Sequence, residues 1–251
     1  MLMNNDDANE IVPSEHEWEL AHRLVIGMAM EDANKIKIEY GDVLTFFPGL
    51  FAESDRAIGI LAFAYIEAQL FDLFSQRLDP KVPGGIASII GPRGILSGVV
   101  AQIRMLSALR WLRPATQHDL RMLARIRNRF AHAHSALTFG DAKIRGYLSS
   151  LTHHEEAFAK DFSNVVLLTR HQYLVRVVMT LFMMYSDLTL MPSSEKAGMG
   201  PMGAFSAGFD DYPTQLQNAL GILIRVVRFI YEDATQGELK RGGFAASPTD
   251  F

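Results

Sequence analysis

The sequence contains no cysteine among its 251 residues. This absence excludes a disulfide framework, a thiol nucleophile and any zinc or iron–sulfur site built on cysteine. It is also typical of proteins that work in a reducing compartment. We therefore expect a cytoplasmic protein.

The sequence also lacks a secretion signal and an uninterrupted apolar run. Residues 1–20 are acidic and polar, and they have neither the basic start nor the apolar stretch of a signal peptide. The most apolar long run, 173–191, contains Arg176 and Asp187. Because charged side chains are costly in hydrocarbon, we interpret this run as a core helix and expect no membrane association.

Motifs of several common enzyme classes are missing. There is no GxxxxGK[ST] phosphate-binding loop, no HExxH zinc motif, and no GxSxG nucleophile motif. The run HHEE, residues 153–156, is rich in metal-binding side chains. Neighbouring residues on a helix point about 100° apart, however, so these side chains converge poorly on one ion. We predict no metal site and no cofactor.

What the sequence does have is a strongly basic middle. Residues 91–150 carry ten basic and two acidic side chains, a net charge of +8, whereas the rest of the chain carries 14 basic and 26 acidic ones, a net charge of −12. A basic segment in an acidic protein indicates a polyanion or an acidic protein surface as its partner. Pairing with the acidic flanks of the same chain explains the segment equally well.

The spacing of apolar residues is helical almost throughout. We expect helices over about 14–38, 54–78, 97–111, 116–134, 141–151, 163–190 and from 213 or 214 onward, with a loop at 193–213. Ser54 and Ser97 are expected to cap two of these helices, and Asp141 is expected to open a third. The pattern predicts an all-α protein: a single helical-bundle domain, residues 54–190, with an N-terminal helical extension, 1–53, and a C-terminal loop and helix, 191–251.

The stretch RIRNRFAHAH, residues 125–134, gathers basic and imidazole side chains on one predicted helix. On an ideal helix the apolar face is formed by Leu120, Leu123, Ile126 and Phe130. The opposite face is formed by Arg121, Arg125, Asn128 and His132. Arg127 lies on the shoulder of the apolar face, where a guanidinium needs a partner, and Glu67 in the 54–78 helix is one candidate. If the protein binds nucleic acid, Arg121, Arg125 and Arg129 are the residues expected to contact it.

Three blocks of the sequence resemble the bacterial mannitol operon repressor family. They are SDRAIGILAFAYIEAQL, GPRGILSGVVAQIRMLSALRWL and HDLRMLARIRNRFAHAHSALTFGDAKIRGYL, which lie in this order within residues 54–151. Members of the family carry similar SDR…E, GP.G.LS…KI and IRN.FAH…..F.D..I segments. Gln102 stands here where the family pattern has a lysine-like residue. The resemblance implies a helical regulatory protein that acts in transcriptional control.

The same stretch is also similar to the R-x(4–6)-H motif of HEPN-domain proteins, many of which are metal-independent ribonucleases. The spacing from Arg127 to His132 matches this motif. The resemblance implies that His132 transfers a proton and that Arg127 stabilises phosphorane charge, with Asn128 between them, and it implies a homodimer that brings two sites together. A titratable imidazole and a planar guanidinium suit this chemistry.

We therefore expect a regulatory protein similar to the mannitol operon repressor family, which binds a protein or a nucleic acid through the basic 91–150 segment. A HEPN-type ribonuclease that cuts RNA with Arg127 and His132 is the first alternative, and a non-catalytic scaffold protein is the second. No helix-turn-helix with an outward basic recognition helix is evident apart from the 116–134 helix itself.

Overall fold

The computed structural model describes residues 14–152, 165, 167–196 and 212–242. Its helices are α1 Glu15–Ala33, α2 Val43–Gly49, the short 3₁₀ helix η1 Leu50–Ala52, α3 Asp55–Arg77, α4 Ala87–Ile90, α5 Val99–Ala108, α6 Pro114–Ala131, α7 Ala142–Ser149, α8 Thr169–Lys196 and α9 Thr214–Gly242. The described residues contain no strand. The prediction of an all-α protein in which more than half of the residues are helical is confirmed.

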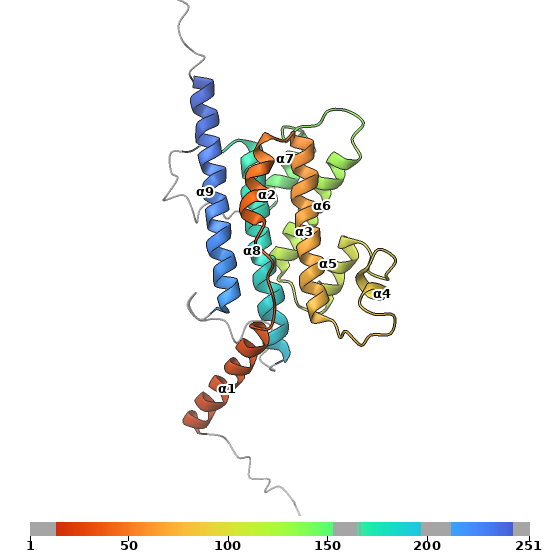
Figure 1. Cartoon of the computed structure of the whole chain (residues 1–251), viewed down its shortest axis with the longest axis vertical. Coiled ribbons are helices and arrows are strands. Elements are labelled where there is room, and N and C mark those ends of the chain that lie inside the picture. Colours follow the sequence, from red (N-terminus) through yellow and green to blue (C-terminus); the bar gives the residue numbers. More distant parts are fainter. Residues whose placement is uncertain (1–13, 153–164, 166, 197–211, 243–251) are drawn as a thin grey trace, which may run out of the picture.

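Helix α8 lies at the centre of the bundle (Figure 1). Helices α1, α3, α6 and α9 pack against it, α5 and α7 pack on α6, and α2 packs on α9. Tyr173 and Tyr185 of α8 are fully buried, and nearly all of the helix between them is buried as well. A helix surrounded on all sides is apolar all round, which explains the long apolar run in the sequence. One hydrophobic core extends from Ala29 in α1 to Tyr231 in α9.

Two helices, α3 and α8, are long and apolar enough to cross a membrane by length and composition alone. In the bundle, 56% of the most apolar window of α3 and 83% of that of α8 are buried. Core helices of soluble proteins meet the same two criteria. The expectations of no membrane association and of a cytoplasmic location remain predictions.

The helix starts follow local chemistry, with two corrections. Ser54 caps α3 by accepting a hydrogen bond from the N–H of Ala57 (3.2 Å), as predicted, and Asp141 caps α7. Ser97 was the wrong residue for the start of α5, because Gly98 occupies the capping position and makes no side-chain bond. Helix α6 begins at Pro114 rather than at 116 or 117, since proline is favoured at the first helical position.

The first helix ends at Ala33, not at residue 38 as predicted. The residues that follow are not helical, and two of them are held by side chains from other helices. The N–H and C=O of Lys37 bond the side-chain amide of Gln76 in α3, and the N–H of Ile38 donates to Gln215 in α9 (2.9 Å). These partners replace the helical hydrogen bonds, so the chain leaves the helix early.

The predicted 163–190 helix is wrong at both ends. Residues 165, 167 and 168 are not helical, and α8 begins at Thr169 and continues past Pro192 to Lys196. The predicted 193–213 loop is therefore wrong for 193–196, and its residues 197–211 lie outside the described part of the chain. Helix α9 begins at Thr214 as predicted. The three-part division at 53/54 and 190/191 remains a prediction.

Candidate functional site

Helix α6 is positioned by its apolar face. Leu120, Leu123, Ile126 and Phe130 are fully buried, as the helical pattern predicted. They pack against α3, α5, α7 and α8, so only one side of α6 is open to solvent. Because the apolar face is packed in the core, α6 cannot rotate about its axis, and its open side keeps one orientation.

The open side of α6 carries a stripe of basic and imidazole side chains, here called the α6 basic face. Its members are spaced by three or four residues and all are exposed: His118, Arg121, Arg125, Arg129 and His132. Residues at this spacing lie one above the other on a helix. The predicted nucleic-acid contacts Arg121, Arg125 and Arg129 are thus brought onto one surface.

Helix α7 extends this surface and fixes part of it. Its Lys143 and Arg145 are exposed. The guanidinium of Arg125 lies 5.8 Å from the centre of the Tyr147 ring, a cation–π distance. The Nε2 of His118 contacts the carbonyl oxygen of Ser150 at 2.8 Å. Two members of the stripe are therefore held against α7, which makes the surface more rigid than free side chains would be.

The two acidic residues of the 91–150 segment do little to neutralise this surface. Asp119 is 2% exposed, and its carboxylate accepts hydrogen bonds from the N–H and hydroxyl of Thr152. Asp141 caps α7 and lies 3.6 Å from Arg129. The backbone N–H of Ile144 and the charge of Arg129 lower the pKa of Asp141. The one cation of the stripe with a described acidic partner is thus Arg129.

Arg127 points toward α3, as predicted. Its Nη2 lies 3.4 Å from Oε2 of Glu67, and its Nη1 donates to Oδ1 of Asn128 (3.0 Å). Burial raises the pKa of Glu67, and the charge of Arg127 lowers it again in part. The side chains of Arg127 and Asn128 are brought together, whereas the side chain of His132 is exposed at the end of the helix. The backbone N–H of His132 donates to the carbonyl oxygen of Asn128.

The end of α6 is closed by the first turn of α3. Arg56 donates to the carbonyl oxygens of Ala131 and Ala133, which have no partner within α6. Asp55 accepts from the N–H of Phe139 at 3.0 Å. The SDR segment, residues 54–56, therefore holds the end of α6 and the loop that follows it.

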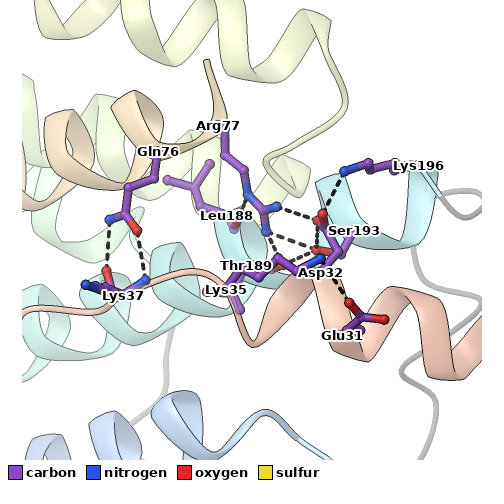
Figure 2. Close-up of polar contacts among 10 residues, drawn as sticks. All are labelled: Glu31, Asp32, Lys35, Lys37, Gln76, Arg77, Leu188, Thr189, Ser193 and Lys196. Carbon is purple, nitrogen blue, oxygen red and sulfur yellow. Dashed lines mark hydrogen bonds and ion pairs between the residues drawn. The ribbon is translucent and has the colours of Figure 1, made fainter. Parts of the chain in front are cut away.

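A second polar cluster, which the sequence interpretation missed, joins α1, α3 and α8 (Figure 2). Arg77 donates from Nη1 to Asp32 (2.7 Å) and from Nη2 to Ser193 (3.0 Å), and Lys196 donates to the other oxygen of Asp32 (2.8 Å). Burial by itself raises the pKa of Asp32, but hydrogen bonds from Lys196, Ser193 and Arg77 outweigh it and lower the pKa from 3.8 to about 2. One sequence signal lies near this cluster, Pro192, just past the end of the predicted 163–190 helix.

The cluster explains how α8 continues past Pro192. Proline has no N–H, so it cannot donate to the carbonyl of Leu188, four residues earlier. The Nε of Arg77 donates to that carbonyl instead (3.0 Å), and its Nη2 donates to the carbonyl of Thr189. Figure 2 shows the guanidinium directed at this turn. Arg77 thus supplies hydrogen bonds that the helix lacks.

A cavity of about 440 Å³ opens beside this cluster. Its lining residues are Asp32, Gln76, Arg77, Trp111, Pro192 and Lys196. The charged and amide groups among them are already bonded to one another, to Ser193 or to the backbone. We therefore assign the cluster a structural role and take the α6 basic face as the candidate functional site.

The described residues contain no group of three or more histidine, cysteine or acidic side chains able to hold a metal ion. The HHEE run at 153–156 lies outside the described part of the chain. No protein-family model matches the chain, and neither curated proteins nor solved structures give a match.

Proposed function

We propose that the chain is a regulatory protein, similar in residues 54–151 to the mannitol operon repressor family, that binds a polyanion through the α6 basic face and α7. The observation that carries this proposal is the concentration of exposed cations on two adjacent helices. Within the basic segment both acidic side chains are engaged, one in the interior and one in a helix cap. Nucleic acid is the polyanion that such a face fits best.

The geometry favours contact with phosphates over the reading of base edges. Helix α6 is covered on its other sides by α3, α5, α7 and α8, so it offers one row of side chains rather than a projecting end. A row of exposed guanidiniums suits phosphate groups, which fix position without sequence information. An acidic protein surface is the other class of partner, and the salt dependence described below separates the two.

Ribonuclease activity is the second candidate, and the exposure of His132 is the observation that supports it. The side chain of Arg127 is 35% exposed, but it is engaged with Glu67 and Asn128. To stabilise a phosphorane it would have to leave these partners, and Glu67 would lose its counter-charge. Because this rearrangement is unfavourable, binding is preferred over catalysis.

If the proposal is right, the affinity for nucleic acid should depend steeply on salt concentration, and Arg121 and Arg125 should each contribute to that dependence. Wild-type affinity for a labelled DNA or RNA duplex should fall linearly on a log–log plot of salt concentration. The double variant Arg121→Ala/Arg125→Ala should bind more weakly, and the slope of that plot should decrease by about 1.8, because two phosphate contacts are lost. Fluorescence anisotropy measures both quantities.

The matched control for that experiment is Arg225→Ala/Arg228→Ala. Both of these arginines are exposed on α9, so the net charge changes equally while the α6 basic face stays intact. The control should keep the wild-type slope. Equal losses in the two double variants would mean that net charge alone drives binding, and affinity that ignores salt would indicate a protein partner. Absence of any binding would leave the scaffold alternative.

The ribonuclease candidate is tested with His132→Ala. Because binding is preferred, wild-type protein in a chelator should leave a single-stranded RNA uncut. The variant should unfold within about 0.5 kcal/mol of the wild type, because this side chain is exposed. If the wild type instead produces fragments with 2′,3′-cyclic phosphate ends, and His132→Ala abolishes them while His134→Ala does not, the catalytic reading replaces the binding one.

A further inference from the structure

The end of α5 has an unusual backbone conformation. Arg110 follows this helix with a φ of 58°, and it is the one non-glycine residue with a positive φ among those that the structure describes. The N–H of Arg110 donates to the carbonyl of Ser107 (3.0 Å), and the N–H of Trp111 donates to that of Leu106 (2.8 Å). This pair of bonds forms the common left-handed cap of a helix, in which glycine is the usual residue at the left-handed position. The fold thus places an arginine where glycine is favoured.

The arginine at this position is strained and makes no described contact. In the left-handed conformation a Cβ lies too close to the backbone carbonyl that follows it, a clash that glycine avoids. Arg110 is exposed, and its guanidinium has no hydrogen-bond or ion-pair partner among the described residues. A cation is favourable near a helix C-terminus, but one in the last turn of α5 would supply that attraction without the strain. A strained residue that contacts nothing within the fold indicates a role outside it.

The surroundings of Arg110 are basic. Arg104 lies within the exposed face of α5, and Arg93 lies in the loop before the helix, where it is also exposed. Neither arginine has an ion pair among the described residues. Residues 91–110 contain no acidic side chain. The partner that fits this part of the surface is therefore an anion.

The chain keeps Arg110 close to the α6 basic face. Arg110 precedes Pro114, the first residue of α6, by four residues, so their Cα atoms lie at most about 14 Å apart. His118, the first member of the α6 basic face, lies about 6 Å further along the helix. A nucleic acid duplex carries one charge about every 1.7 Å along its axis, so a single polyanion can contact both places at once.

We propose that Arg104 and Arg110 form a second phosphate contact for the nucleic acid that binds the α6 basic face. This proposal rests on the proposed function and adds a contact on α5 to it. A planar guanidinium can donate two hydrogen bonds to one phosphate, and those of Arg104 and Arg110 have no described partner to leave first. Contacts along α6 fix the position of the nucleic acid, and a further contact outside that row fixes its direction.

The variant Arg110→Gly separates binding from folding, because glycine removes the guanidinium and accepts the left-handed backbone. Its Tm should not fall below that of the wild type. In fluorescence anisotropy with a labelled duplex, the slope of log affinity against log salt concentration should decrease by about 0.9, because one phosphate contact is lost. For Arg104→Ala/Arg110→Gly the decrease should be about 1.8.

Arg228→Ala is the matched control for the loss of one charge, because Arg228 is an exposed arginine of α9, and it should keep the wild-type slope. If Arg104→Ala/Arg110→Gly keeps that slope while Arg121→Ala/Arg125→Ala reduces it, this inference is overturned and the proposed function stands. The reverse pattern supports the α5 contact and removes the α6 basic face from the proposed function. A wild type that binds no duplex overturns both. A lower Tm for Arg110→Gly also overturns the inference, because the arginine would then stabilise the cap.

Discussion

Replacing Arg113 with methionine is expected to lower the free energy of unfolding by about 3 to 5 kcal/mol at neutral pH. Arg113 precedes α6 and donates to Asp187 of α8 through its backbone N–H (2.9 Å) and its Nε. The side chain of Asp187 is only 1% exposed. Methionine keeps most of the side-chain volume but removes the guanidinium, so a buried carboxylate loses its counter-charge.

The size of this loss should depend on pH. Burial raises the pKa of Asp187 above its usual value, and the charge of Arg113 lowers it again in part. Without Arg113 the pKa rises further, so at mildly acidic pH the carboxyl of the folded variant takes up a proton and the buried charge disappears. The loss of stability relative to the wild type is therefore largest above the pKa that Asp187 has in the folded variant. It shrinks as the pH falls through that pKa.

Urea unfolding at neutral and mildly acidic pH measures both effects. The exposed Arg145 on α7 provides the control, since Arg145→Met should change stability by no more than about 0.5 kcal/mol. In the double variant Arg113→Met/Asp187→Leu the unpaired charge is gone, and most of the lost stability should return. A deficit for Arg113→Met that is equal at both pH values would contradict the explanation.

Replacing Gly59 with alanine is expected to cost about 2 kcal/mol, although alanine is the better helix former. A Cβ at this position of α3 would lie 2.2 Å from Cδ2 and 2.6 Å from Cε2 of Phe130 in α6. That ring is fully buried against Phe139 (5.0 Å between ring centres), which packs in turn on Tyr173 (4.7 Å). The ring has no space to move into, so overpacking outweighs the gain in helix propensity.

Gly221→Ala is the matched comparison, because it should raise the free energy of unfolding rather than lower it. This glycine lies inside α9, is exposed, and has nothing within 4 Å of its added Cβ, so the variant should gain about 0.5 to 1 kcal/mol. The double variant Gly59→Ala/Phe130→Leu should recover part of the loss by making room. Thermal or urea unfolding of the three variants tests whether the added Cβ overpacks the core against Phe130. A Gly59→Ala variant as stable as the wild type would contradict that explanation.

Residues of the three blocks on which the predicted resemblance rests contact one another across the bundle. Asp55 and Arg56 fix the end of α6 and the loop after it, and Glu67 faces Arg127. Gln102, which departs from the family pattern in the second block, donates to the carbonyl of Leu96 (3.0 Å) and so holds the loop before α5. The three blocks therefore account for the architecture of residues 54–151 better than for a binding or catalytic surface.

The identity of the helices and their inward faces could be predicted because they depend on local spacing. A period of three to four residues fixes which side chains share a face, so the burial of Leu120, Leu123, Ile126 and Phe130 in α6 followed from the sequence alone. The sequence also predicted that Arg127, on the shoulder of the apolar face, needs a carboxylate partner. Glu67 was one candidate, and the structure pairs the two.

The tertiary structure alone decided where several helices end and which polar groups meet. Lys37 and Ile38 lie outside a helix because Gln76 and Gln215 bond their backbone from other helices. Helix α8 continues past Pro192 because Arg77, more than a hundred residues earlier, donates to the carbonyls of Leu188 and Thr189. These outcomes depend on hydrogen-bond partners that are distant in sequence, and a local pattern holds no information about them.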